Sequence, residues 1–331
     1  MKVLVTGGAG YIGSTVCSAL LDSGHTPVIL DNLVTGCESF TKDRIFYDCD
    51  IADKAGVRAL FDEHPDIKAL IHCAAFIIVP ESVENPYEYY RENVGKSVEL
   101  FKTAIDCGCE RIIFSSSASV YDQVEGFIVN EDSPLKPGSP YARTKLMIET
   151  VLRDYCAAYG VKGITLRYFN PIGADPKMRT GPYIRNASHV LARLVDVSRG
   201  FEPEFSITGV NWTTRDGSGL RDYIHIWDLA RAHVLAVEKF DSAFEKAGNS
   251  ENYLTINLGS GSGVTVKELV SAFEEVLGSD IPKRETDPRP GDVAGACANA
   301  DKAFSLLGWR VEKSMADGIS DALEWNKRFF V

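Results

Sequence analysis

The chain opens with Lys2-Val3-Leu4-Val5-Thr6-Gly7-Gly8-Ala9-Gly10-Tyr11-Ile12-Gly13, in which an aliphatic run leads directly into glycines three residues apart. The run predicts a buried strand, and residues 14–21 predict a helix. Gly7 would permit a tight turn, Gly10 would let the backbone approach a pyrophosphate, and Gly13 would let the helix pack closely on the strand. Strand, glycine turn and helix in this order predict a dinucleotide-binding loop, with the pyrophosphate at the helix N-terminus.

A second short strand, Val28-Ile29-Leu30, ends in Asp31, 18 positions after Gly13. An acidic residue at about this distance binds the ribose 2′-hydroxyl, and its charge would repel a 2′-phosphate. We therefore expect NAD as the cofactor and not NADP. The spacing Gly-x-x-Gly-x-x-Gly differs from the commoner Gly-x-Gly-x-x-Gly and indicates a subclass within this fold.

A second group of candidate functional residues follows another apolar run, Ile112-Ile113-Phe114-Ser115-Ser116-Ser117. Tyr141 and Lys145 come next, four residues apart, and would share one face of a helix. A free phenol has a pKa of about 10, and a nearby positive charge favours the phenolate. Tyr141 is therefore a candidate general acid and base, with Lys145 lowering its pKa and Ser117 beside it.

The order of apolar and amphipathic stretches predicts the architecture. Near-continuous apolar strands alternate with amphipathic helices, which predicts an α/β fold of Rossmann type with a doubly wound parallel sheet. The expected strands are residues 44–51, 69–75, 111–117 and 163–169, and the expected helices are residues 54–63, 92–107 and 141–159. The link from Asp31 to Arg44 is too short for a full crossover helix. Loops dominate after Pro171, where we expect a smaller C-terminal lobe.

Composition excludes several classes of partner. The 331 residues carry a formal charge of −11, which argues against nucleic acid or an anionic membrane as the main partner. The longest apolar stretch, around residues 69–79, is too short to cross a bilayer, and a core strand begins so early that we expect no signal peptide. The eight cysteines lack metal-ligand spacing, so we expect no metal and a cytoplasmic protein with reduced thiols.

Longer motifs identify a family. Besides the opening glycine run, the chain contains Ser115-Ser116-Ser117-Ala118-Ser119-Val120-Tyr121, Ser139-Pro140-Tyr141, Arg167-Tyr168-Phe169-Asn170-Pro171-Ile172-Gly173-Ala174 and Arg221-Asp222-Tyr223-Ile224-His225. In this order, from residue 1 to about 325, the motifs resemble the UDP-galactose (UDP-glucose) 4-epimerases of the extended short-chain dehydrogenase/reductase superfamily. The resemblance implies an isomerase that acts on a nucleotide-sugar in galactose metabolism. It divides the chain into an NAD-binding domain, residues 1–170 plus about 222–258, and a substrate lobe, residues 171–221 and 259–331.

The resemblance also implies a mechanism. NAD takes a hydride from C4 of a UDP-hexose and returns it to the other face of a transient 4-keto sugar. Tyr141 would carry the C4 hydroxyl proton, Lys145 would lower the phenol pKa and bind the nicotinamide ribose, and Ser117 would bind the C4 oxygen. Further matching positions would bind the cofactor: Gly7, Gly10, Tyr11, Ile12, Gly13, Asp31, Asn32, Asp50, Ile51, Ala74, Ala75, Asn93, Tyr141, Lys145 and Tyr168. The substrate would contact Ser117, Tyr141, Asn170, Asn186, Arg221, Arg289, Asp292 and Ala296.

Several positions depart from the family pattern or extend it. Ile77 stands where the family often has a lysine, and Asp122 where it usually has a glycine. Residues 178–188 are also unlike the usual pattern. Ala296, four places after Asp292, is small, as in members that accept N-acetylated sugars. The helices predicted at residues 92–107 and 141–159 would form the usual face of a homodimer.

Three alternative functions remain open at this point. A 4,6-dehydratase would need an Asp-Glu pair where this chain has Ala118-Ser119, so it ranks low. A UDP-uronate epimerase or decarboxylase is harder to exclude, because a single arginine can decide it. A non-catalytic NAD-binding sensor would not need serine, tyrosine and lysine together.

Overall fold

A seven-stranded parallel sheet forms the centre of the computed structural model, which describes residues 1–184, 189–248, 251–288 and 293–330. The strand order is β11-β7-β5-β4-β1-β2-β3, so the direction of the connections reverses at β1. This order confirms the predicted Rossmann-type doubly wound fold. The strands are β1 (Lys2–Thr6), β2 (Thr26–Asp31), β3 (Ile45–Asp48), β4 (Ile67–His72), β5 (Arg111–Ser115), β7 (Lys162–Tyr168) and β11 (Tyr253–Leu258).

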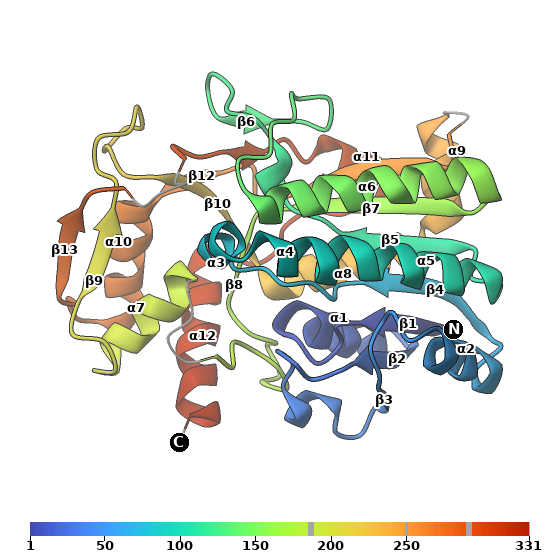
Figure 1. Ribbon diagram of the computed structural model, residues 1–331. Helices are drawn as coiled ribbons and strands as arrows, with labels where there is room; N and C mark the ends of the chain where they lie inside the picture. The colour runs from blue at the N-terminus through green and yellow to red at the C-terminus, as the bar shows by residue number, and fades with distance from the viewer. Residues whose placement is uncertain (185–188, 249–250, 289–292, 331) are drawn as a thin grey trace.

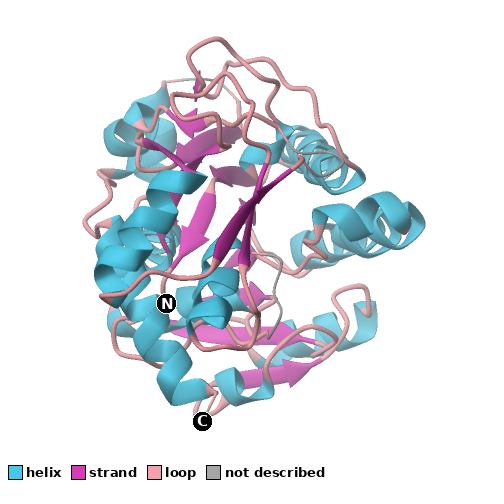
Figure 2. Cartoon of the chain, turned by 90° about the vertical axis from the view of Figure 1, so that its left-hand side faces the viewer, coloured by secondary structure: helices cyan, strands magenta, loops and turns pink. Residues whose placement is uncertain are grey.

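Helices cover both faces of this sheet (Figures 1 and 2). Alternate strand residues face opposite cores: Val3 and Val5 pack in one, and Leu4 packs in the other. The first core contains α1 (Tyr11–Asp22), α8 (Ile226–Glu238), α9 (Phe240–Ala247) and α11 (Asp301–Leu307). The second contains α2 (Lys54–Glu63), α5 (Lys96–Asp106) and α6 (Pro140–Tyr159). Burial on both sides explains why the strands are continuously apolar in sequence.

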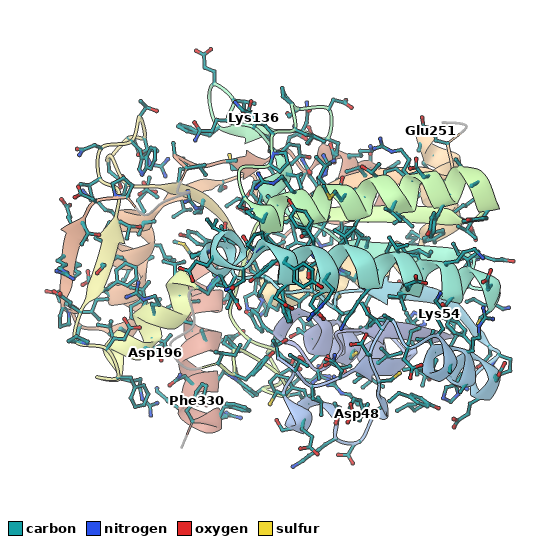
Figure 3. The ribbon with its side chains drawn as sticks, in the orientation of Figure 1. Asp48, Lys54, Lys136, Asp196, Glu251 and Phe330 are labelled. Atoms are coloured by element: carbon teal, nitrogen blue, oxygen red, sulfur yellow. The ribbon has the colours of Figure 1, made fainter. Side chains whose placement is uncertain are left out.

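A third core lies outside the large sheet, among the three-stranded sheet β12-β10-β8, the pair β13-β9 and the helices beside them. Side chains fill the spaces between the layers, whereas charged groups such as Lys54 and Lys136 project from the surface (Figure 3). The elements around this core are β8 (Asn170–Ile172), β9 (Phe205–Thr208), β10 (Leu220–His225), β12 (Gly263–Thr265), β13 (Lys283–Thr286), α7 (Val190–Ser198), α10 (Val266–Leu277) and α12 (Met315–Phe329). A further short pair joins β6 (Ile128–Val129) to β14 (Cys297–Ala298).

Two local features refine the expectations from sequence. The link between β2 and β3 contains only the 3₁₀ turn η1 (Glu38–Thr41), as its length predicted. The helix expected at residues 92–107 is instead composite, because the π-helical turn η2 (Tyr90–Gly95) precedes α5. Short helices α3 (Val79–Glu84) and α4 (Pro86–Tyr89) lead into it, and η3 (Ala118–Val120) follows β5. Such π turns occur frequently at functional sites.

Metal ligands, membrane-spanning helices and disulfides bear on the chemistry that the chain can support. Among the described residues, no group of three or more histidine, cysteine or acidic side chains could hold a metal ion. Within the same part of the chain, every helix is too short or too polar to cross a membrane. All eight cysteines are free thiols in the structure.

Candidate active site

The glycine loop lies at the carboxyl end of β1, where the order of the strands reverses and where ligands bind in such folds. Gly7 has φ +71°, and an added Cβ would lie 2.6 Å from the backbone nitrogen of Ala74. A Cβ on Gly13 would lie 2.1 Å from the carbonyl oxygen of Gly7. The loop therefore excludes side chains at these positions, in agreement with the roles predicted for them.

Asp31 fixes the loop from the end of β2. Its carboxylate accepts hydrogen bonds from the backbone N–H groups of Ala9, at 3.0 Å, and Leu33, at 2.9 Å. Burial raises the pKa of Asp31, although these two bonds lower it. The residue thus shapes the loop as well as lining the pocket beside it.

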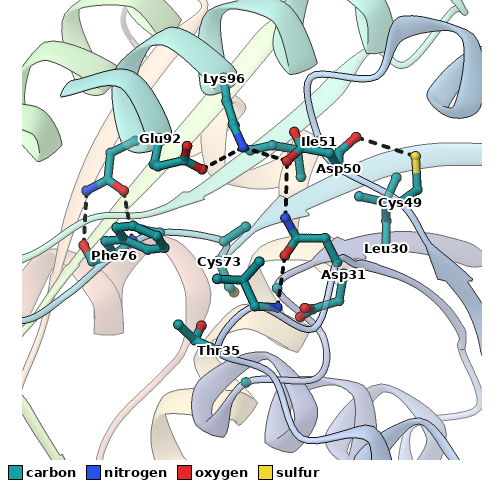
Figure 4. A pocket seen from close by; sticks show the side chains of 17 residues that line it. Leu30, Asp31, Thr35, Cys49, Asp50, Ile51, Cys73, Phe76, Glu92 and Lys96 are labelled. Atoms are coloured by element: carbon teal, nitrogen blue, oxygen red, sulfur yellow. Dashed lines mark hydrogen bonds and ion pairs between the residues drawn. The ribbon is translucent and has the colours of Figure 1, made fainter. Parts of the chain in front are cut away.

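That pocket brings together nine of the predicted cofactor residues (Figure 4). They come from four strand ends and from η2. Asn93 holds the wall formed by residues 74–78, because its side-chain amide bonds both the N–H of Phe76, at 2.8 Å, and its carbonyl, at 3.0 Å. The nine residues are Gly7, Gly10, Asp31, Asn32, Asp50, Ile51, Ala74, Ala75 and Asn93.

Tyr11 and Ile12 occupy other positions. The Tyr11 hydroxyl donates to the carbonyl of Gly173 at 2.6 Å, joining α1 to the segment after β8. Ile12 packs against the first core. Their side chains therefore serve the fold around the loop and not the lining of the pocket.

Ser117 and Tyr141 come together near the end of β5. Ser117 begins the turn η3, and its hydroxyl accepts from the N–H of Ser119 at 3.2 Å. Tyr141 stands at the start of α6, which is capped by Ser139 and has Pro140 in its first turn. Burial raises the pKa of the Tyr141 phenol, and its side-chain hydrogen bond with Ser117 lowers it. The predicted pair therefore shares a hydrogen bond in a buried site.

Lys145 is bound to the backbone at the end of β5, and its pKa is shifted by burial. Its ammonium donates to the carbonyl of Ser115 at 2.9 Å and lies 5.9 Å from the centre of the Tyr141 ring. Burial lowers the pKa of Lys145 to about 8, although Cys73 and Glu149 raise it. The raised pKa of Tyr141 arises from its own burial, which outweighs the hydrogen bond with Ser117.

Ser115 connects this group to the cofactor pocket. Its hydroxyl lies 3.2 Å from the sulfur of Cys73, which lines the pocket, and 2.8 Å from Nε2 of His233. Tyr168 ends the neighbouring strand β7, with its ring 6.3 Å from that of His233. Asn93 also donates to the hydroxyl of Thr144 on α6 at 3.1 Å. The pocket and the group around Tyr141 therefore form one site.

A buried ion pair connects the strands and the helix that carry the site. The Arg167 guanidinium donates to both carboxylate oxygens of Glu149, at 2.7 and 3.0 Å, and each side chain is 2% exposed. Glu149 also accepts from the hydroxyl of Ser116 at 2.5 Å, and Arg167 donates to that of Tyr121 at 3.0 Å. The network holds the ends of β5 and β7 against α6. The motif around Arg167 did not predict this structural role.

The substrate residues are only partly described. Asn170 lies on β8, paired with Tyr223 of β10, and Arg221 donates to the carbonyl of its neighbour Leu220 at 2.7 Å. Asp222 is not the ion-pair partner of Arg221, because its buried carboxylate accepts from the backbone of residues 260, 261 and 298. Ala296 packs beside the cluster that contains Val120, Tyr121 and Phe169. Asn186, Arg289 and Asp292 lie outside the described residues.

Sequence reasoning missed several residues of the pocket. Glu92 and Lys96 line it from η2 and α5, although their four-residue spacing on a predicted helix was a usable signal. Tyr183, from the lobe, donates to the carbonyl of Thr35 at 2.5 Å and lies near Gly10. Ile77 is 63% exposed and brings no charge to the pocket.

Comparison with known proteins agrees with this site. Residues 3–258 match the model of the NAD dependent epimerase/dehydratase family. The UDP-glucose 4-epimerases of Bacillus subtilis and Azospirillum brasilense are each 40% identical to this chain, over 98% of it and 96% and 92% of their own lengths.

Solved structures agree as well. A UDP-glucose-4-epimerase from Stenotrophomonas maltophila, with bound NAD and formylated UDP-arabinopyranose, superposes with a TM-score of 0.92 at 37% identity, covering 99% of this chain and 98% of that one. The Bifidobacterium longum enzyme, in complex with NAD+ and UDP, gives a TM-score of 0.90 at 34% identity with the same coverage. A match of this extent, over a site of this composition, places the chain in the NAD dependent epimerase/dehydratase family.

Proposed function

We propose that this protein is a UDP-glucose 4-epimerase, which interconverts UDP-galactose and UDP-glucose through a transient 4-keto sugar and a resident NAD. One observation carries the proposal: Ser117 contacts the buried Tyr141, with Lys145 buried beside it, at the carboxyl end of the sheet that also holds the glycine-loop pocket. The named UDP-glucose 4-epimerases that match the chain over nearly its whole length support the same activity.

The residues of the pocket fit NAD. The loop has no room for side chains at Gly7 and Gly13, which leaves backbone N–H groups at the start of α1 to bind a pyrophosphate. Asp31 presents a carboxylate for the ribose hydroxyls and disfavours a 2′-phosphate. Asp50 and Ile51 would flank the adenine, and Tyr168 and Lys145 would lie at the nicotinamide end. When bound, NAD supplies the acceptor and later the donor of the C4 hydride.

Side chains of this protein would transfer the proton of the C4 hydroxyl. The Tyr141 phenol would take the proton of the C4 hydroxyl as the 4-keto sugar forms and return it as the alcohol is restored. Ser117 would hold the C4 oxygen in line and, through its hydrogen bond, lower the pKa of the phenol. The pKa of Lys145 is about 8, so the side chain is charged below that pH. In its charged form it would favour the phenolate of Tyr141.

The substrate would lie between this site and the lobe. Asn170 and Arg221, with Asn186, Arg289 and Asp292, would bind the uridine diphosphate, for which the arginine fork suits phosphate oxygens. The small side chain of Ala296 would leave space for an N-acetyl group. Turnover of UDP-N-acetylglucosamine tests that extension, and its absence beside brisk UDP-galactose turnover would refute it.

Three further features belong to the proposal. Residues 1–170 with about 222–258 would bind NAD, and the remaining segments would form the substrate lobe, although α11 of the last segment packs in the first core. Helices α5 and α6 would form a homodimer face, on which Met147 and Tyr159 are 43% and 47% exposed. Eight free thiols suit the cytoplasm.

A coupled assay of the purified protein with UDP-galactose, without added NAD, tests the activity. We expect turnover that Tyr141→Phe loses while keeping its fold and its bound NAD. A silent wild-type protein that reacts with UDP-glucuronate when NAD is supplied would show that the substrate is wrong. Full activity in Tyr141→Phe would refute its role as acid and base.

A further inference from the structure

A chain of charged and polar side chains crosses from one wall of the cofactor pocket to the other (Figure 4). The Lys96 ammonium lies 2.5 Å from the carboxylate of Asp50 and 2.5 Å from that of Glu92. Asp50 in turn accepts from the side-chain amide of Asn32 at 3.1 Å. We call Asn32, Asp50, Glu92 and Lys96 the strap.

The strap joins segments that are distant in sequence. Asn32 follows β2 and Asp50 follows β3, so both belong to the wall near the expected ribose and adenine positions. Glu92 lies in η2 and Lys96 begins α5, so they belong to the opposite wall. Lys96 therefore connects the two walls of the pocket through its ion pairs with Asp50 and Glu92.

Partial burial shields these pairs from screening by salt more than ordinary surface pairs. The side chains of Lys96, Glu92 and Asp50 are 22%, 15% and 33% exposed. Partial burial alone lowers the pKa of Lys96, but its bonds to Asp50 and Glu92 raise it above the ordinary value. On the same helix, Lys102 and Asp106 form a pair of the same spacing that is 41% and 35% exposed and lies away from the pocket.

The charges of the pocket lining also bear on how an anionic nucleotide is held. Its described lining carries three carboxylates, Asp31, Asp50 and Glu92, and one ammonium, Lys96. A dinucleotide brings a negatively charged pyrophosphate into this setting. Without Lys96 the described lining would be purely acidic and would repel it. Lys96 thus holds the walls together and offsets their charge, and both effects slow the release of an anionic nucleotide.

We propose that Lys96, through the strap, is the residue that retains NAD in this protein and sets how slowly it is released. The inference rests on the proposed function, since it takes NAD as the resident nucleotide. Lys96 is a positioning residue in this role, because it acts by holding Asp50 and the opposite wall in place.

Exchange of the bound nucleotide provides the test. Purified holoprotein is mixed with excess isotopically labelled NAD, and the bound fraction is followed by mass spectrometry. We expect Lys96→Met to release NAD about tenfold faster, equivalent to about 1.4 kcal/mol. Lys102→Met, which removes the matched pair outside the pocket, should exchange at the wild-type rate, and Lys96→Arg should restore most of the retention.

Salt distinguishes an ionic strap from a packing effect. Raising sodium chloride should speed exchange in the wild-type protein and leave Lys96→Met nearly unchanged, because screening weakens only ion pairs that exist. Equal exchange rates in Lys96→Met and Lys102→Met, or slower exchange in Lys96→Met, would overturn the inference while leaving the epimerase proposal intact. A wild-type protein that neither retains nor binds NAD would overturn both.

Discussion

Replacing Lys145 by methionine should change how the stability of the nucleotide-free protein depends on pH. Methionine keeps most of the apolar stem but removes the charge. The pKa of Lys145 falls from the ordinary 10.5 to about 8 through burial. At 1.36 kcal/mol per pKa unit, holding the buried ammonium costs the folded state about 3 kcal/mol at pH 7.

The sign of the effect follows from proton counting. Between pH 8 and 10.5 the unfolded chain keeps the lysine proton that the folded chain has lost, so the free energy of unfolding rises with pH. The penalty is full below pH 8 and disappears as pH rises toward 10.5. Between pH 7 and 9.5 the wild-type protein should gain about 2 kcal/mol relative to Lys145→Met.

The comparison at a single pH is less informative. Methionine also leaves the carbonyl of Ser115 without the bond that Lys145 donates, and an unpaired buried carbonyl costs about 1–3 kcal/mol. That loss offsets most of the gain at pH 7, whereas it is independent of pH. Urea unfolding of both proteins from pH 7 to 9.5 isolates the titration. A difference in free energy of unfolding that stays constant across this range would show that Lys145 keeps its ordinary pKa.

Two other predictions follow from packing. Glu149→Gln should lower the free energy of unfolding by about 3–5 kcal/mol, because it leaves the Arg167 guanidinium buried without its counter-charge. Thermal and urea unfolding measure this, and adding Arg167→Met should recover most of the loss; a double variant as unstable as the single one would contradict the ion-pair account. Gly13→Ala should abolish NAD binding, since its Cβ would meet the Gly7 carbonyl, whereas Gly138→Ala, with open space around it, should bind normally. Equal NAD affinities in calorimetry would contradict the steric argument.

The local sequence pattern was sufficient to predict the strands, the glycine loop and the short link before β3. The strands and the glycine loop depend on residue spacing and on backbone freedom at Gly7 and Gly13, which are visible in sequence. The absence of a crossover helix before β3 follows from chain length alone. These features do not depend on which distant segments they meet.

The remaining features depend on tertiary surroundings. The low pKa of Lys145 arises from desolvation by neighbours that the four-residue spacing does not reveal. Asp222 is adjacent to Arg221 in sequence, yet its partners are the Ser260 hydroxyl and the N–H groups of residues 260, 261 and 298. Lys96 and Asp50 meet only because β3 and α5 border the same pocket. In each case the sequence identifies the residue, but not the tertiary contacts that it makes.

The position of β11 at the edge of the large sheet has a consequence for synthesis. This strand, like α8 on one face of the sheet, is made only after the segments 171–221, most of which form the lobe. A nascent chain ending near residue 170 would present strand β7 without its neighbour and an apolar face without α8. The large sheet is therefore completed only once residue 258 has left the ribosome, and its first core only after Trp309, so the unfinished sheet is the stage at which chaperones would matter most.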